Sequence, residues 1–335
     1  MKKRILTGDR PTGRLHIGHL VGTLQNRVRL QDEYECFFVI ADLQVLTDHI
    51  DLHSNIEANI FEVMCDYLSV GLKPENCFFI QSQVPELCEL TMYFSFLVSL
   101  ASVQRNPTVK SEAEMYGVSQ MSLGFVSYPV SQAADILAFN ADLVPVGQDQ
   151  LPHIEQAREV ARTFNRTFGK KIFNLPEALV GEIPVLSGTK GDQKMSKSLN
   201  NQIDLAHSGE ETSLRIGKMV TDVQRVFRKD VGHPDSCQAF KYWSIFAPEA
   251  TQQVRFECEG AMRGCKECKA QLADKMNTYL GEIREKRKYY ASKPNLVWEI
   301  LASGTKRARQ VAKQTLMEVR ESMHLSFPLL KLPSD

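Results

Sequence analysis

The sequence predicts an α/β protein, with a Rossmann-like doubly wound parallel sheet followed by a smaller helical domain. Short, almost uninterrupted apolar runs occupy residues 4–8, 36–42, 77–81 and 143–146. Strands of a parallel sheet are buried on both faces, which explains why their sequences are continuously apolar. Helical stretches separate the runs, as in βαβ units. Strand signals fade after about residue 205, so we expect a Rossmann-like domain over 1–205 and a helical domain over 206–335.

Helical periodicity defines the elements between these strands. We expect helices at 18–33, 53–70, 86–103, 130–139 and 149–165. Residues 104–127 interrupt the alternation, and we expect them at the rim of a site or at a subunit interface. A chain of 335 residues is long enough for two separate cores.

Composition narrows the class of protein. The chain is 43% hydrophobic and 24% charged, which is ordinary for a globular protein. No apolar run approaches the length of a membrane span, and the apolar stretch after residues 1–4 is too short for a signal peptide. We therefore expect a cytoplasmic protein with no role at a membrane or on DNA.

A phosphate-binding turn is predicted near the start of the chain. The first strand is followed by Pro11, Thr12 and Gly13, and a helix begins at Gly18. A helix N-terminus offers backbone N–H groups and a favourable dipole to phosphate. His16 and His19 stand three residues apart at this entry, where both could donate to phosphate oxygens. Surface histidines or metal ligands would show the same spacing.

A second polar segment, at residues 188–198, favours the phosphate interpretation. Lys194 and Lys197 are three residues apart and are flanked by Ser196 and Ser198 after a glycine-containing loop. Such a loop can act as a mobile clamp on pyrophosphate charge. A solvated basic loop is the alternative, but the ordered pairing with the first segment argues against it.

Residues 16–19 (HIGH) and 194–198 (KMSKS) resemble the two signature motifs of class I aminoacyl-tRNA synthetases. Segments 7–13, 128–137 and 144–153 resemble the tryptophanyl-tRNA synthetases in particular. The resemblance is dense over residues 4–200. It implies ATP-dependent activation of L-tryptophan, transfer to tRNA(Trp), a homodimer, and a second domain that reads the anticodon.

The resemblance also implies site residues. The catalytic residues would be His16, His19, Lys194 and Lys197. ATP would contact Arg10, Thr12, Gly18, His19, Lys110, Gly147, Asp149, Lys194, Met195, Ser196, Lys197 and Ser198. Tryptophan would contact Gly8, Tyr128, Asp135, Val146 and Gln150. Mg²⁺ would be held mainly by the ATP phosphates.

Asp135 is the pocket residue for which chemistry gives an independent reason. It stands in an apolar helical stretch, where a carboxylate is costly unless it is partnered. The indole N–H is the single donor of the tryptophan side chain, so a buried acceptor suits it. An internally hydrogen-bonded structural aspartate would fit the same sequence. The resemblance assigns Asp135 to the indole N–H.

Two alternative functions stay open at this stage. A tyrosyl-tRNA synthetase would also use carboxylate and amide acceptors in its pocket. A synthetase-like regulatory paralogue that binds tryptophan or RNA would not charge tRNA, although it would not need both phosphate-binding segments. Arg10, His19 and Gln132 differ from the commoner pattern of the family and leave the fine geometry of the pocket open.

The second half of the chain carries an excess of basic side chains, although the whole chain has no net charge. Basic clusters stand at 225–229, 284–288 and 306–309. Any one of them fits a solvated helix face, but three in one helical region favour contact with RNA phosphates.

Eight cysteines divide into two groups. Cys36, Cys65, Cys77 and Cys88 are scattered in apolar contexts and are expected to be buried thiols. The other four form a cluster in the basic region: Cys237, Cys258, Cys265 and Cys268. Four thiolates with one CxxC pair suit Zn²⁺ or a [4Fe–4S] cluster, and spacing alone does not choose between them. Some tryptophanyl-tRNA synthetases carry a similar four-cysteine iron–sulfur motif, so the resemblance favours [4Fe–4S].

Overall fold

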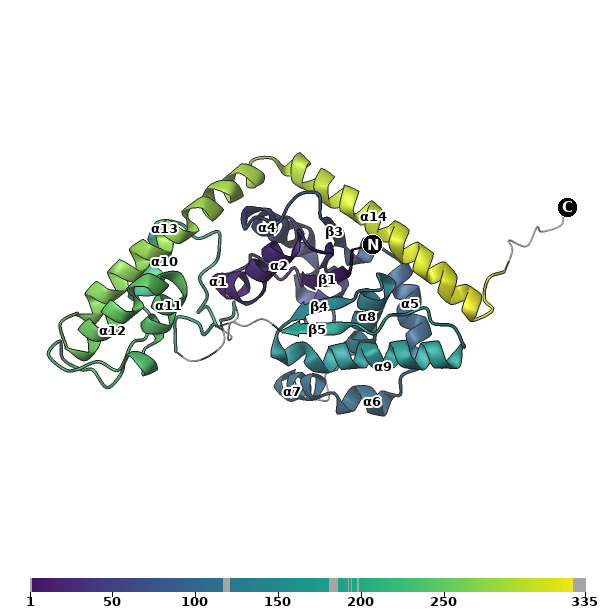
Figure 1. The fold of residues 1–335 in the computed structure, drawn as a ribbon, viewed down its shortest axis with the longest axis horizontal. Coiled ribbons are helices and arrows are strands. Elements are labelled where there is room, and N and C mark those ends of the chain that lie inside the picture. The colour runs from purple at the N-terminus through teal and green to yellow at the C-terminus, as the bar shows by residue number, and fades with distance from the viewer. Residues whose placement is uncertain are drawn as a thin grey trace.

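A computed structural model describes residues 2–116, 121–180, 186–191, 193, 195–197 and 199–327. Its centre is a five-stranded sheet of order β3-β2-β1-β4-β5 (Figure 1). All neighbouring strands are parallel. The strands are β1 (Arg4–Asp9), β2 (Glu35–Ile40), β3 (Cys77–Ile80), β4 (Leu143–Val146) and β5 (Glu177–Val180). The first four coincide closely with the predicted apolar runs. β5 was not predicted because it is a short edge strand without buried residues.

Alternate residues of the strands belong to two different cores. Ile5 and Phe38 pack against the helices that follow β1 and β2. Their neighbours Leu6 and Phe37 pack in a second cluster with helices from later in the chain. Because successive strand residues point to opposite faces, this division requires layers of helix on both sides of the sheet. The predicted doubly wound α/β fold is confirmed.

The first helical stretch is not one regular helix. It consists of α1 (Ile17–His19), a π-helical turn η1 (Leu20–Leu24) and α2 (Gln25–Leu30), where a single helix over 18–33 was predicted. π-helical turns inside α-helices occur frequently at functional sites. Here the turn lies directly after the first signature segment.

The remaining helices of the sheet-containing part include the predicted ones with shifted ends. They are α3 (Asp42–Val45), α4 (Ile56–Ser69), α5 (Glu86–Ser95), α6 (Leu100–Arg105), α7 (Pro107–Tyr116), α8 (Leu123–Ala138) and α9 (Leu151–Thr167). The single helix predicted over 86–103 is wrong, because the structure interrupts it between Ser95 and Leu100, and the helices at 42–45 and 107–116 were not predicted. Helix α8 starts earlier than the predicted helix over 130–139 and continues through Pro129, because Ser122 caps the earlier start by accepting from the Phe125 N–H. Residues 104–127 therefore contain α7 and the first turn of α8.

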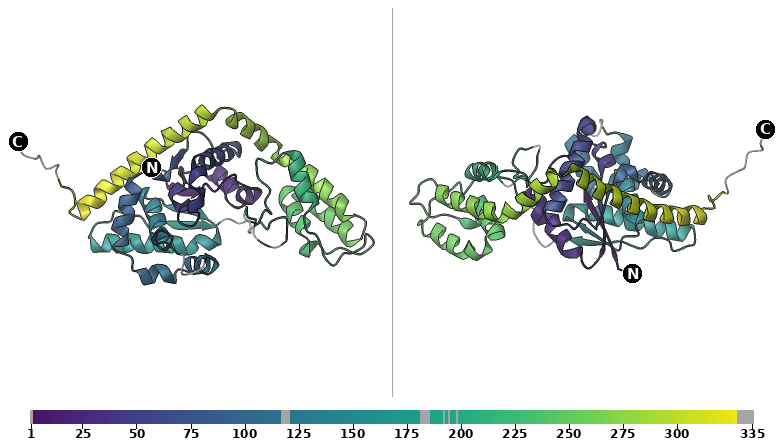
Figure 2. Two further views of the ribbon diagram at one scale, coloured as in Figure 1. Left: turned by 180° about the vertical axis from the view of Figure 1, so that it is seen from behind. Right: turned by 90° about the horizontal axis from the view of Figure 1, so that it is seen from above.

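The second half of the chain is helical, as predicted. Its helices are α10 (Gly209–Gly217), α11 (Gln238–Phe246), α12 (Thr251–Glu259), α13 (Cys265–Ala291) and α14 (Pro294–Ser322). The first four form a separate lobe, and α13 leads from that lobe to α14 (Figures 1 and 2).

Helix α14 lies along the sheet rather than in the helical lobe. At Gly304 it approaches β3 so closely that a Cβ would come within 2.0 Å of the Phe78 carbonyl oxygen. The Cys77 Sγ donates to the Gly304 carbonyl at 3.2 Å, and the Thr315 hydroxyl donates to the Ala138 carbonyl at 2.8 Å. The division at residue 205 stays a prediction.

Three of the four scattered cysteines are buried, as expected: Cys36, Cys65 and Cys77. Cys88 is exposed, which corrects the prediction for that residue. It stands on α5, whose apolar stripe includes Leu87 and Leu90 instead. No helix in the part of the chain that the structure describes is long and apolar enough to cross a membrane.

Candidate active site

One cavity of about 1100 Å³ opens at the carboxyl ends of the strands. Its wall includes Asp9 from the end of β1, Ala41 after β2 and Gly147 after β4. β1 and β4 are neighbours in the sheet, and the strand order reverses between them. Ligands of doubly wound folds bind at this switch point.

The first signature segment forms the rim of the cavity. Gly18 is required there because a Cβ would lie 2.9 Å from the His16 Nδ1 atom. The His16 N–H donates to the His19 Nδ1 at 3.2 Å. In neutral His19 the ring proton is then on Nε2, which can donate to a ligand. The sequence therefore positions one imidazole donor at the start of the helix.

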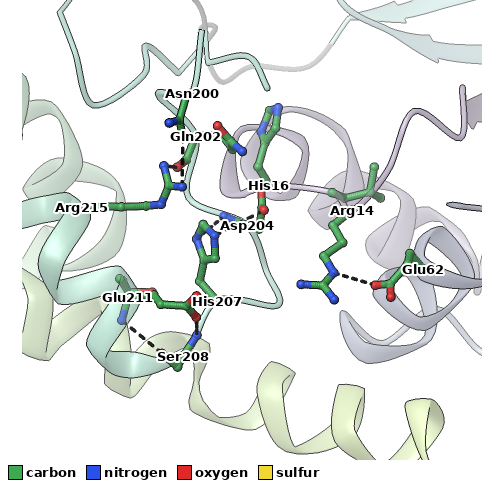
Figure 3. A network of polar contacts seen from close by, with 12 residues as sticks. Arg14, His16, Glu62, Asn200, Gln202, Asp204, His207, Ser208, Glu211 and Arg215 are labelled. Carbon is green, nitrogen blue, oxygen red and sulfur yellow. Dashed lines mark hydrogen bonds and ion pairs between the residues drawn. The ribbon is translucent and has the colours of Figure 1, made fainter. Parts of the chain in front are cut away.

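The chain that follows the second signature segment is joined to the first. The Ile17 N–H donates to the Ile203 carbonyl at 2.9 Å, and the Leu205 N–H donates to the Leu15 carbonyl at 3.0 Å. His16 and Asp204 form the antiparallel bridge between these bonds (Figure 3). Two segments almost 190 residues apart are thus held side by side.

Side chains hold both strands of this bridge in place. The Asp204 N–H donates to the His207 Nδ1 at 3.0 Å, and Arg215 on α10 donates to the Gln202 carbonyl at 2.8 Å. On the other side, Arg14 pairs with Glu62 of α4 at 2.9 Å (Figure 3). The bridge is therefore supported from α10 and from α4 at once.

Lys197 is the described lysine of the second segment. Its Nζ lies 3.4 Å from the Thr12 hydroxyl, so it reaches the phosphate-binding turn. Burial lowers the pKa of Lys197, and the charges of Asp204, Asp66 and Asp9 oppose that effect. Lys194 and Ser198 lie outside the described residues. Met195 is buried and lines the cavity, and the Ser196 N–H donates to Asn201 at 2.8 Å.

Asp135 lies at the apolar end of the cavity and is 3% exposed. Burial raises its pKa to about 7, although hydrogen bonds from Gln81 and Gln44 counteract that effect. Both amide groups donate to the carboxylate. Asp135 is thus internally hydrogen-bonded, as the structural alternative predicts. Its carboxylate also lines the cavity, as the substrate-binding interpretation requires.

Tyr128 is held by a chain of three hydrogen bonds. Its hydroxyl donates to Glu112 at 2.7 Å and lies 3.1 Å from the His153 Nε2. The Asn106 side-chain amide lies 3.3 Å from the His153 Nδ1. Burial lowers the pKa of His153 to about 4, so its ring is neutral at pH 7. In a neutral ring, Nε2–H donates to the Tyr128 hydroxyl and Nδ1 accepts from the Asn106 amide. This tautomer is consistent with all three hydrogen bonds.

Asp9 is the centre of a buried charged group below the phosphate-binding turn. Its Oδ2 accepts from Arg27 at 2.7 Å and from the Tyr67 hydroxyl at 2.7 Å. Burial alone would raise the pKa of Asp9, but Arg27, His19 and Tyr67 outweigh it and lower that pKa to about 2. The end of β1 therefore carries a permanently ionised, fixed carboxylate.

Most of the predicted site residues in the described chain line this one cavity: Gly8, Arg10, Thr12, His16, Gly18, His19, Tyr128, Asp135, Val146, Gly147, Asp149, Gln150 and Met195. Arg10 pairs with Asp48 at 2.6 Å. Lys110 is exposed on α7 and is not among the lining residues. No structural contact in the described chain singles it out for ATP.

Sequence reasoning missed several lining residues that are charged or polar. They are Asp9, Arg27, Gln44, Glu112 and His153. Arg27 is one of several charged residues in a stretch predicted as an amphipathic helix, and the charged residues of such a helix normally face solvent. Gln44 and Glu112 lie outside any motif. The position of each helix relative to the cavity, rather than local pattern, determines that they belong to the site.

The four clustered cysteines come from three different segments. Cys237 precedes α11, Cys258 is on α12, and Cys265 and Cys268 begin α13. Burial raises the pKa of the Cys258 thiol, and the other three cysteines add to that effect because they lie nearby. The Trp243 indole N–H donates to the Cys268 Sγ at 3.3 Å. Among the described residues, no three His, Cys, Asp or Glu side chains have the arrangement of a metal site.

Comparison with known proteins agrees with this geometry. The family model for class I tRNA synthetases (W and Y) matches residues 1–281. The tryptophan–tRNA ligase of Streptococcus pneumoniae is 44% identical, over 97% of this chain and 99% of its own. That of Clostridium longisporum is 42% identical, over 97% of this chain and 98% of its own.

A solved structure is similar over the same length. The tryptophanyl-tRNA synthetase of Campylobacter jejuni, complexed with ADP and tryptophan, superimposes with a TM-score of 0.85. It is 33% identical and matches 96% of this chain and 100% of its own. The chain belongs to the class I aminoacyl-tRNA synthetases that activate tryptophan or tyrosine.

Proposed function

We propose that this protein is a tryptophan–tRNA ligase, which activates L-tryptophan with ATP and transfers it to tRNA(Trp). The observation that carries the proposal is one cavity that is lined both by the phosphate-binding rim and by the buried carboxylate of Asp135. The rim contains the first signature segment and Met195 of the second. Streptococcal and clostridial relatives named tryptophan–tRNA ligase share the whole length of the chain.

The two ends of the cavity suit the two reactants. ATP phosphates would lie at the rim, near His19, Thr12 and Lys197. The indole ring would lie at the other end, with its N–H toward Asp135. The carboxylate of tryptophan then lies between these ends, where it can attack the α-phosphate. The bond formed is the mixed anhydride, and pyrophosphate leaves.

Adenylate formation needs alignment and charge stabilisation more than covalent help. His19 and Lys197 would donate to phosphate oxygens as negative charge develops on the leaving pyrophosphate. Mg²⁺ would bind the phosphates, and we assign it no protein ligand. The ammonium group of tryptophan would contact Tyr128 and Gln150, which line the cavity.

The substrate separates this proposal from its alternatives. ATP–pyrophosphate exchange is measured with the purified protein and each amino acid in turn. Exchange with tryptophan and not tyrosine is expected, because the relatives that are 42% to 44% identical to this chain are named tryptophan–tRNA ligase. Exchange with tyrosine would favour the tyrosyl enzyme. Absence of exchange with every amino acid would favour the regulatory paralogue.

In the proposed transfer step, tRNA contacts the basic second half of the chain. Fewer basic side chains are available for this contact than the sequence suggests, because several are paired within the chain. Arg287 pairs with Asp66, Arg284 donates to Asn277 at 2.9 Å, and Arg309 donates to Glu86 at 3.1 Å. These arginines hold the chain together. Arg228 and Lys229 are exposed beside Phe227, which is 63% exposed. Basic side chains with an exposed aromatic ring suit single-stranded RNA, so we assign the anticodon contact to residues 225–229.

A homodimer is also part of the proposal. Met92 on α5, Phe96 directly after α5 and Leu100 at the start of α6 are each more than half exposed. Large apolar side chains exposed so near one another in the chain suit an interaction surface. Phe96→Asp is expected to convert a dimer to a monomer in light scattering. A monomeric natural protein would contradict this assignment.

The four clustered cysteines would hold a [4Fe–4S] cluster, with Zn²⁺ as the alternative. Support comes from the spacing of the four cysteines in the sequence and from their positions at the starts of α11 and α13 and on α12, in one lobe of the chain. Arg225 lies 4.0 Å from the Cys258 Sγ, and a positive charge there suits bound thiolates. The group would join the segment before α11 to α12 and α13 and would thereby fix the RNA-binding loop at 225–229.

A further inference from the structure

Two glutamines hold the carboxylate of Asp135 from behind. The Gln81 Nε2 lies 2.9 Å from Oδ1 and 2.8 Å from Oδ2, and the Gln44 Nε2 lies 3.1 Å from Oδ2. Gln81 follows β3 and Gln44 is on α3, which follows β2. The sheet thus brings two amide donors to a side chain on α8.

The amide of Gln81 is oriented by this contact. Gln81 is 1% exposed, and its Oε1 has no hydrogen-bond partner among the described residues. A buried amide normally turns so that both its polar ends are satisfied. Gln81 leaves its acceptor without a bond and directs its donors to Asp135. The interaction with the carboxylate therefore outweighs the cost of the unpaired oxygen.

The Asp135 carboxylate has more acceptor sites than the two glutamines occupy. A carboxylate offers about four lone-pair sites, two on each oxygen. The two sites of Oδ2 are used by Gln81 and Gln44, whereas Oδ1 accepts from Gln81 alone. Asp135 and Gln44 line the cavity, but Gln81 lies behind them. One site on Oδ1 is left for a donor that enters the cavity.

We propose that Gln81 and Gln44 are positioning residues that hold Asp135 with one acceptor site open to the indole N–H of the substrate. They thereby determine the preference for tryptophan over amino acids that lack this donor. The inference rests on the proposed function and deepens it. Neither glutamine is a catalytic residue, because both act through Asp135.

Electrostatics gives these donors a second role. Burial and the charge of Asp42 on α3 both favour the neutral form of Asp135, and the Cys88 thiol on α5 also faces it. Hydrogen bonds from the two glutamines favour the ionised form. Removal of either donor raises the pKa of Asp135 further. Tryptophan binding should then weaken at a higher pH than in the natural protein.

The test compares tryptophan with its benzothienyl analogue, in which sulfur replaces the indole N–H. ATP–pyrophosphate exchange is measured for Gln81→Met with both amino acids. The KM for tryptophan should rise about ten- to a hundredfold, as for loss of a hydrogen bond to a charged group, and kcat should change little. The KM for the analogue should change less than about twofold, because it has no N–H to donate.

The pH profile supplies a second readout. In Gln81→Met the rise of the tryptophan KM on acidification should begin at higher pH than in the natural protein. Gln31→Met is the matched control. Gln31 is also buried and hydrogen-bonded, to the Val28 and Gly71 carbonyls, but lies outside the cavity. It should alter neither the profile nor the ratio of the two KM values.

Equal rises of KM for both amino acids would overturn the inference, since they would indicate only a damaged pocket. If Gln81→Met does not fold, Gln44→Met tests the same point and should show the same pattern with a smaller change. Suppose that the natural protein exchanges with tryptophan, but the variants raise the KM for tryptophan and for the analogue equally. That result overturns this inference and leaves the proposed function intact. A natural protein without exchange overturns the proposed function as well.

Discussion

Arg287 on α13 donates from Nε to the buried carboxylate of Asp66 on α4 at 2.6 Å. The other oxygen of Asp66 accepts the backbone N–H of Leu15 at 2.7 Å. Leu15 directly precedes His16, so one carboxylate joins the second half of the chain to the first signature segment. Arg287 also pairs with Glu62, which in turn holds Arg14. Arg287, Asp66, Glu62 and Arg14 therefore connect α13 to the phosphate-binding rim.

Arg287→Met is expected to weaken ATP binding and to destabilise the protein. Asp66 is completely buried, and burial already raises its pKa to about 6 even with Arg287 present. Without that partner Asp66 becomes protonated at pH 7 and holds the Leu15 N–H less firmly. Removal of one member of a buried ion pair costs about 3 kcal/mol. ATP titrations of pyrophosphate exchange and urea unfolding measure the two effects.

Arg284→Met is the matched control for this prediction. Arg284 is on the same helix, but it contacts Asn277 and Thr212 within the helical part of the chain. It should lower stability without a change in the KM for ATP. If both variants changed that KM equally, the link through Asp66 would have no special role.

Asp9→Asn is expected to destabilise the protein at neutral pH but not in acid. The folded protein lowers the pKa of Asp9 from 3.8 to about 2, because Arg27, His19 and Tyr67 outweigh burial. A lowered carboxyl pKa stabilises the fold above the unfolded value, and this stability is lost as the pH falls from about 4 to 2. The difference at pH 7 should be roughly 2 kcal/mol. Urea unfolding at a series of pH values should show the two proteins converge below pH 4.

The sheet and the phosphate-binding rim could be predicted from sequence because both depend on local pattern. Four continuous apolar runs correspond to four strands, and His16, Gly18 and His19 stand in one short segment. Residues such as Gln81 and Arg287 could not be predicted in this way. Their roles depend on contacts with Asp135, 54 residues away, and Asp66, 221 residues away. Nothing in the neighbouring sequence distinguishes them from surface residues.

For the basic clusters, the sequence pattern predicted a function that the contacts of the side chains do not support. The pattern at 284–288 predicted contact with RNA, yet Arg284 and Arg287 bind partners within the chain. Sequence gives the sign of a charge but not what faces it. For β5 the pattern was too short and too exposed to be recognised, and its pairing with β4 decides its conformation.

Lys197→Ala is expected to slow adenylate formation without weakening tryptophan binding. The Lys197 Nζ lies 3.4 Å from the Thr12 hydroxyl at the rim, and in the proposed mechanism its charge acts on the leaving pyrophosphate. Loss of one such group typically reduces the rate about a hundredfold or more. Single-turnover adenylate formation and calorimetric titration with tryptophan measure the two quantities separately. Lys190→Ala is the control, because Lys190 is exposed in the same loop and donates to the Leu199 carbonyl at 3.0 Å. Equal losses in rate and in tryptophan affinity for Lys197→Ala would rule out the clamp.

Cys265→Ser is expected to remove the proposed metal group and to impair charging of tRNA, while pyrophosphate exchange continues. Cys258 lies beside Arg225 in the helical lobe, whereas the cavity proposed for adenylate formation opens at the sheet, so the two activities should separate. Iron and acid-labile sulfide, visible absorbance, and zinc content are measured on anaerobically purified protein. Cys36→Ser controls for loss of a thiol outside the cluster, because Cys36 is not among the residues that line the cavity. Charging should fall about tenfold, corresponding to about 1.4 kcal/mol of lost RNA contact.

A brown natural protein that contains iron and loses its colour in Cys265→Ser supports the cluster, and a colourless zinc protein supports the alternative. Unchanged metal content and unchanged charging in the variant would contradict the proposed role of these four cysteines.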